Sequence, residues 1–97
     1  MTRYKIVVKT RGFTYFVTKR FREFEELHKI VKQKYNLNFS QFPSKVNLLK
    51  SQEAVFRDRK IALEKFLNFV QSHVYKNLGS VYMQEYYEFI EIGNFKT

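Results

Sequence analysis

The sequence predicts an α+β domain, in which a small antiparallel β-sheet of two to three strands packs against a helical subdomain of three to four helices. Two observations predict this class. Near the N-terminus apolar and polar residues alternate with the period of half-buried strands, and from Arg22 onward apolar residues recur at helical spacing. Strands followed by a run of helices are typical of α+β domains. At 97 residues, we expect the chain to form a single domain, 1–97.

Two strands are expected at about 4–9 and 13–19. One face of each strand carries large apolar residues, and these are Tyr4, Ile6, Val8, Phe13, Tyr15 and Val17. Gly12 lies between the strands and can adopt a positive φ at little cost, so the two strands are predicted to form a hairpin.

Helices are expected at about 22–34, 52–72 and 78–92, the last as one or two short helices. Ser51 is the predicted N-cap of the second helix, because its hydroxyl can accept a hydrogen bond from the first turn. The segment 36–51 has neither period and contains the single proline of the chain, so it is expected to be a long, functional loop.

The composition and the absence of catalytic motifs favour a binding function over an enzymatic one. The net charge of +9 attracts polyanions, of which nucleic acid and anionic lipid are the two obvious classes. There is no cysteine, the two histidines, His28 and His73, lack a ligand spacing, and no phosphate-binding glycine loop or nucleophile motif is present. We therefore expect no enzyme activity, no metal and no cofactor.

No apolar run is long enough to span a bilayer, so any membrane contact is expected to be peripheral. The absence of cysteine fits a reducing compartment, and we expect a cytoplasmic location.

Three motifs follow one another along the chain. The first is KRFREF at 19–24, followed by Leu27 and His28, the second is FPSK at 42–45, and the third is the segment 59–67. In order and spacing they resemble the motifs R-R-Y/F-x-x-F-x-x-L-H, F/L-P-x-K and R-x-x-x-L-E-x-F/Y-L of PX (phox homology) domains. The resemblance covers nearly the whole chain and implies the PX fold and a phosphoinositide ligand, most often phosphorylated at the 3-position.

The resemblance also implies a role for each of four residues. Arg20 would hold the 3-phosphate, for which a planar guanidinium is suited. Phe21 would pack against the inositol ring, Lys45 would meet the 1-phosphate, and Arg59 would bind the hydroxyls at positions 4 and 5. Considered one at a time, each of these three cations is more often a solvated surface charge than a ligand-binding residue, and Phe21 is more often a core residue.

The loop after Lys45 carries Val46, Leu48 and Leu49 between lysines. The family uses this segment to enter the bilayer, which is one interpretation of these residues. The other is that Leu48 or Leu49 packs beneath its own loop.

The sequence departs from the family in showing two strands before the first helix, where three are usual. Either the initial strand lies outside this chain or it is missing, and an open edge at Tyr4 to Val8 would then invite pairing with another chain. The P-x-x-P segment of many relatives is also absent.

The resemblance implies a sorting-nexin-like role in endosomal traffic, peripheral on an anionic membrane, with possible protein partners in trafficking complexes. Two rivals stay open. One is a PX-like protein-interaction module with an idle lipid pocket, and the other is a nucleic-acid-binding domain, against which the core spacing of most aromatics argues.

Overall fold

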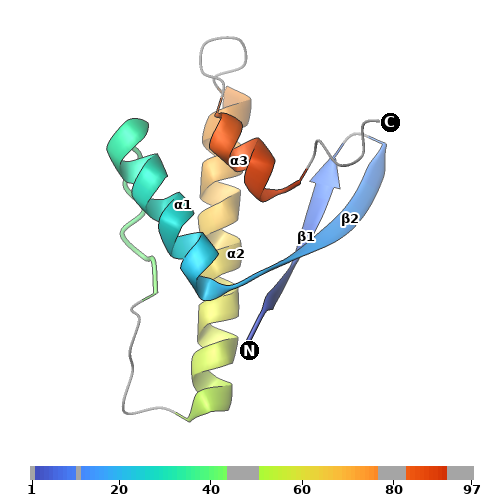
Figure 1. Cartoon of the computed structure of the whole chain (residues 1–97), viewed down its shortest axis with the longest axis vertical. Helices are drawn as coiled ribbons and strands as arrows, with labels where there is room; N and C mark the ends of the chain where they lie inside the picture. The colour runs from blue at the N-terminus through green and yellow to red at the C-terminus, as the bar shows by residue number, and fades with distance from the viewer. Residues whose placement is uncertain (1, 11, 44–50, 77–82, 92–97) are drawn as a thin grey trace.

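The computed structural model describes residues 2–10, 12–43, 51–76 and 83–91, and this part of the chain forms a two-stranded antiparallel sheet and three helices (Figure 1). The predicted α+β class is confirmed. The elements in chain order are β1 (Tyr4–Thr10), β2 (Phe13–Lys19), α1 (Phe21–Lys34), α2 (Gln52–Lys76) and α3 (Gln84–Phe89).

The predicted hairpin is present, with β1 and β2 paired antiparallel so that Val7 lies opposite Phe16. Gly12 adopts a φ of 95° in the turn, the left-handed conformation that glycine tolerates. One face of the hairpin is buried on the helices and the other is open to solvent. The buried residues of the inner face are Tyr4, Ile6, Val8 and Val17.

Helix α1 begins at Phe21, one residue before the predicted start, and Arg20 alone separates it from β2. The Glu23 carboxylate accepts a hydrogen bond from the Arg20 backbone N–H at 3.1 Å, which links the extended residue before the helix to its first turn. The helix ends at Lys34, as predicted. Asn36 follows in the left-handed region, with a φ of 56°.

Helix α2 begins where Ser51 was predicted to cap it, because the Ala54 N–H donates to Ser51 Oγ at 3.2 Å. It continues to Lys76, beyond the predicted end near Ser72. The buried residues Val70 and Val74 are four apart, so the core-facing stripe runs on through the polar residues between them.

Helix α3 is shorter than the predicted segment 78–92 and spans Gln84–Phe89. Residues 77–82 lie outside the described part of the chain. Glu91, with a φ of 58°, leaves the helical conformation just after the end of α3.

The core lies where the inner face of the hairpin meets the three helices, with α3 crossing the space between the α1/α2 pair and the sheet (Figure 1). Phe24 of α1 contacts Tyr4 and Phe89 edge-on, at centroid distances of 6.4 and 4.9 Å. The Tyr15 hydroxyl donates to the Ile90 carbonyl at 2.7 Å and joins β2 to the end of α3. The fully buried side chains of α2, Leu63, Phe66 and Val70, complete this core.

No helix within the described residues is both long and apolar enough to cross a membrane.

Candidate functional site

Arg20 occupies the junction between β2 and α1. Its backbone is extended, with φ −83° and ψ 157°, and its carbonyl accepts hydrogen bonds from the first turn of α1. The side chain is exposed and forms no ion pair with any residue that the structure describes. A cation at the start of a 14-residue helix works against the helix dipole, while an anion bound there would be favoured by both.

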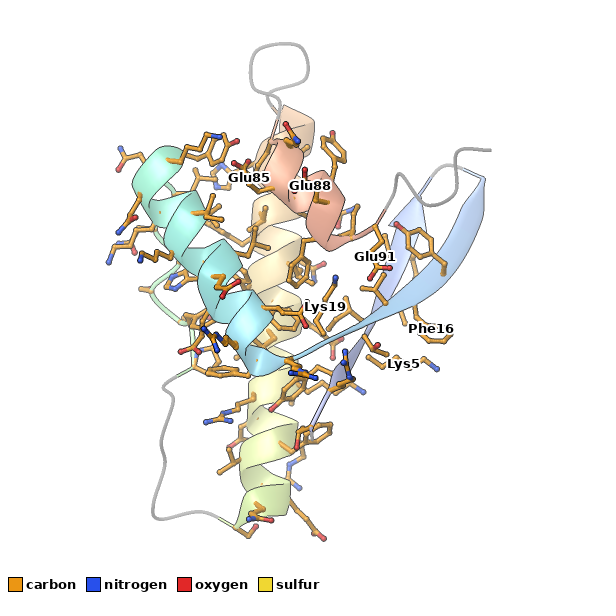
Figure 2. The ribbon with its side chains drawn as sticks, in the orientation of Figure 1. Lys5, Phe16, Lys19, Glu85, Glu88 and Glu91 are labelled. Atoms are coloured by element: carbon orange, nitrogen blue, oxygen red, sulfur yellow. The ribbon has the colours of Figure 1, made fainter. Side chains whose placement is uncertain are left out.

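The neighbouring cations differ from Arg20 because each of them has a carboxylate partner. Lys19 contacts Glu91 at 3.1 Å and Glu23 at 3.7 Å, and Figure 2 shows it pointing toward Glu91. Arg22 pairs with Glu26 at 3.6 Å along the helix. Arg20 is therefore the cation at this junction that is available to an external anion.

Phe21 and Arg59 are in direct contact, although they come from different helices. The guanidinium carbon of Arg59 in α2 lies 4.4 Å from the centre of the Phe21 ring. Both side chains are half-buried. A guanidinium that stacks on an aromatic ring keeps its N–H donors in its own plane, the geometry that suits phosphate and hydroxyl oxygens. The Nε of Arg59 is buried, so its terminal nitrogens are the donors that a ligand could meet.

The Arg59 contact changes the expectation for Phe21. The resemblance implied that an inositol ring would pack against Phe21, whereas in the structure the Arg59 guanidinium covers one face of that ring. A ligand at this site would meet Phe21 at its remaining surface and Arg59 at its outer edge.

Phe42 and His28 form the floor beside Phe21, and sequence reasoning gave neither of them a role in the site. Their rings stack in parallel, with centroids 4.2 Å apart and an interplanar angle of 3°. Phe42 also contacts the Phe21 ring at 5.9 Å and the core residue Phe66 at 5.3 Å. These contacts hold Phe42 against both α1 and α2.

Two sequence signals could have found this floor. Phe42 belongs to the same FPSK segment as Lys45, and His28 follows Phe21 by seven residues, which puts both on one face of α1.

Burial lowers the pKa of His28 below its ordinary value of 6.5, and the positive charge of Lys32 lowers it further, while a hydrogen bond with the Phe39 backbone opposes the shift. Among the described residues, none forms a hydrogen bond with His28 Nε2, which is buried. His28 is thus held neutral at physiological pH and serves as an aromatic surface in the floor.

Of the four predicted headgroup residues, the structure brings Phe21 and Arg59 into contact, and Arg20 directly precedes Phe21 in the chain with an exposed side chain. Lys45 and the predicted insertion residues Val46, Leu48 and Leu49 lie outside the described residues. An arginine stacked on an aromatic ring, with a second, exposed arginine next to that ring in the chain, can bind an anion that carries a hydroxylated ring.

The chain was compared with family models, curated proteins and solved structures. The family model described as the PX domain matches residues 7–91, a range that contains Arg20, Phe21, Lys45 and Arg59. No curated protein and no solved structure matches the chain significantly.

Proposed function

The chain belongs to the PX-domain family of phosphoinositide-binding, membrane-targeting modules, which are not enzymes, and from that premise we propose that it recognises phosphatidylinositol 3-phosphate on endosomal membranes. The observation that supports the proposal best is the stack of Arg59 on Phe21 at 4.4 Å. Arg20, which is exposed, directly precedes Phe21 in the chain.

Arg20 is proposed to bind the 3-phosphate. Its guanidinium can form two parallel charge-assisted hydrogen bonds with a phosphate, and the N-terminus of α1 adds a favourable dipole at the same place. The hydrogen bond from its backbone N–H to the Glu23 carboxylate, at 3.1 Å, holds the backbone of Arg20 in place at the start of α1.

Arg59 is proposed to bind the ring hydroxyls at positions 4 and 5 and so to set selectivity. Because the guanidinium packs against the Phe21 ring, Arg59 would have little freedom to move aside for an additional phosphate on the lipid. This restriction favours the singly phosphorylated lipid over more highly phosphorylated ones.

Lys45 is proposed to meet the 1-phosphate, and Val46, Leu48 and Leu49 to enter the bilayer. Lys45 follows Pro43 by two residues in the sequence, and Phe42, next to Pro43, contacts Phe21. Phe42, two residues before the first residue outside the described part of the chain, therefore lies beside Phe21.

The energies favour several contributions acting together. A basic residue near an anionic leaflet contributes about 1 kcal/mol, and a fully inserted Leu about 1.5–3 kcal/mol. A micromolar complex requires roughly 8 kcal/mol. Headgroup contacts must add to both terms, so the domain would require its lipid in an anionic membrane, as a sorting-nexin-like role in protein transport demands.

The test is co-sedimentation with liposomes that contain each phosphoinositide at fixed total charge and near-physiological salt. We expect wild-type protein to bind the 3-phosphate lipid and Arg20→Ala to lose at least tenfold in affinity. Arg22→Ala is the matched control, because Arg22 lies two residues away on the same turn but pairs with Glu26. It should bind like wild type.

Arg59→Lys tests selectivity in the same assay. Lysine keeps the charge but loses the planar donors, so we expect weaker binding to the 3-phosphate lipid and a smaller preference over the bisphosphorylated lipids. Equal binding of all proteins to every anionic liposome would contradict the headgroup site. A protein-interaction module with an idle pocket would then be the next candidate, followed by a nucleic-acid-binding domain.

A further inference from the structure

Among the residues that the structure describes, the outer edge of β1 carries no paired strand. One edge of β1 pairs with β2 from Tyr4 opposite Lys19 to Thr10 opposite Phe13, and no other strand pairs with it in the part of the chain that the structure describes. An open edge presents a row of backbone N–H and C=O groups that another strand can satisfy.

A groove runs along this edge. Its walls are four consecutive residues of β1, Ile6 to Lys9, on one side and residues of α2 on the other, with Tyr86 and Ile90 also lining it. The α2 residues are Glu64, Leu67, Asn68 and Gln71, so the groove contains one carboxylate and favours uncharged side chains on the side of a partner strand that faces it. Because side chains of a strand alternate between its faces, four consecutive lining residues mean that the backbone edge itself borders the groove. A strand added there would place every second side chain into the groove, against Leu67 and Tyr86.

The outer face of the hairpin supplies a second contact surface. Val7 and Phe16 lie opposite each other and are 58% and 56% exposed. Lys5 Nζ lies 4.2 Å from the centre of the Phe16 ring, and Figure 2 shows the two side chains together on this face. Lys9 is exposed on the same face, and within the described residues neither lysine forms an ion pair.

We propose that an extended, acidic segment of a partner protein adds to β1 as a third strand. The partner strand would carry apolar residues on the side facing the groove. On its other side it would carry an acidic residue beside Lys5, an apolar residue beside Val7 and an acidic residue beside Lys9. Opposite charges and apolar pairs on neighbouring strands stabilise such pairing.

A second copy of this chain fits the edge poorly. When two β1 strands pair antiparallel about their midpoint, Val7, each Lys5 lies opposite a Lys9, and like charges directly opposite are destabilising. The net charge of +9 on each copy adds long-range repulsion. The same charges favour an acidic strand.

The probe is a capped heptapeptide, TEIVIET, titrated into ¹⁵N-labelled protein. Its sequence reads the same in both directions, so parallel and antiparallel addition place the same side chains on each face. We expect shift changes at β1 and at the α2 residues of the groove. TKIVIKT should bind at least tenfold more weakly, and TEIPIET, whose proline removes a backbone donor, should not bind.

The double variant Lys5→Glu/Lys9→Glu should reverse this order and prefer TKIVIKT, while both substitutions are exposed and leave the core intact. Arg20→Ala should bind TEIVIET like wild type, which separates this surface from the lipid site. Absence of TEIVIET binding, equal binding of both charged peptides, or shift changes confined to other elements would overturn the proposal. It would also be overturned if the double variant lost binding to phosphatidylserine liposomes while TEIVIET failed to bind, because the face would then be a membrane contact.

Discussion

Arg59 and Phe21 illustrate how single residues define the candidate site. The Phe21 ring meets Arg59 on one face and Phe42 at 5.9 Å, and Phe42 in turn stacks on His28. The positions of the charged groups therefore depend on a row of aromatic contacts. Such support limits side-chain motion and prepares the arginine for its ligand before the ligand arrives.

His28 gives the floor of the site a predicted pH dependence. Because burial lowers its pKa in the folded state, the unfolded chain binds a proton first as the pH falls through about 6.5. The folded state is then destabilised down to the lowered pKa, whereas above pH 6.5 both states are neutral. We expect the fall in melting temperature between pH 7.5 and 5.5 to be smaller for His28→Gln than for wild type.

His73→Gln is the control for this measurement, because the His73 ring contacts Phe69 within α2. It should keep the wild-type dependence on pH. An unchanged dependence in His28→Gln would show that the neutral His28 ring does not contribute to stability in this range.

At the scale of elements, a polar link joins the end of α1 to the start of α3. The Tyr35 hydroxyl donates to Glu85 at 2.6 Å, and Lys34 donates to the other oxygen of the same carboxylate at 2.7 Å. These two hydrogen bonds, with Lys34 the larger contribution, lower the pKa of Glu85 from 4.5 to about 2. The link fixes the angle at which α3 crosses toward the sheet.

Tyr35→Phe tests the link. Loss of a hydrogen bond to a partly exposed carboxylate should lower the free energy of unfolding by about 1 kcal/mol at pH 7, measured by urea denaturation. Because the pKa of Glu85 is lowered in the folded state, its stabilisation is present above pH 4.5 and is lost as the pH falls toward 2. The difference between wild type and Tyr35→Phe should therefore shrink at pH 3, and a difference that stays constant would contradict this account.

At the scale of the whole molecule, charge and core have separate roles. The net charge of +9 acts over the entire surface and brings the protein toward any anionic membrane. The core holds the site residues in place, because Phe66, which is fully buried, contacts both His28 and Phe42. Attraction is therefore distributed over the molecule, while the proposed recognition site is confined to one junction.

Salt should distinguish these two roles. Raising NaCl from about 0.1 to 0.5 M shortens the Debye length from roughly 10 Å to about 4 Å, which screens exposed charges more than partly buried pairs. We expect binding to phosphatidylserine liposomes to fall at least tenfold and binding to a soluble 3-phosphorylated headgroup to fall less, both measured by calorimetry or sedimentation. Arg20→Ala should keep the salt dependence toward phosphatidylserine, and an equal fall for both ligands would contradict the division.

The sequence by itself determined the kind and order of the elements. The alternation in β1 and β2, the glycine turn at Gly12, the change of period before α1 and the cap at Ser51 are all local signals, and the structure contains each of them. Local signals are less reliable at helix ends. Helix α2 extends beyond its predicted end, and its buried residues continue as far as Val74. The motifs also identified the family, because they record residue types at fixed spacings.

Only the tertiary structure decided what these residues do to one another. Nothing in the spacing of Phe21 and Arg59 says that one covers the ring of the other, and the parallel stack of Phe42 on His28 likewise joins a loop to a helix. The groove along β1 exists because α2 and the end of α3 pack beside an open strand edge. Such contacts join residues far apart in the chain and depend on how whole elements pack, which the periodicity of a single sequence does not encode.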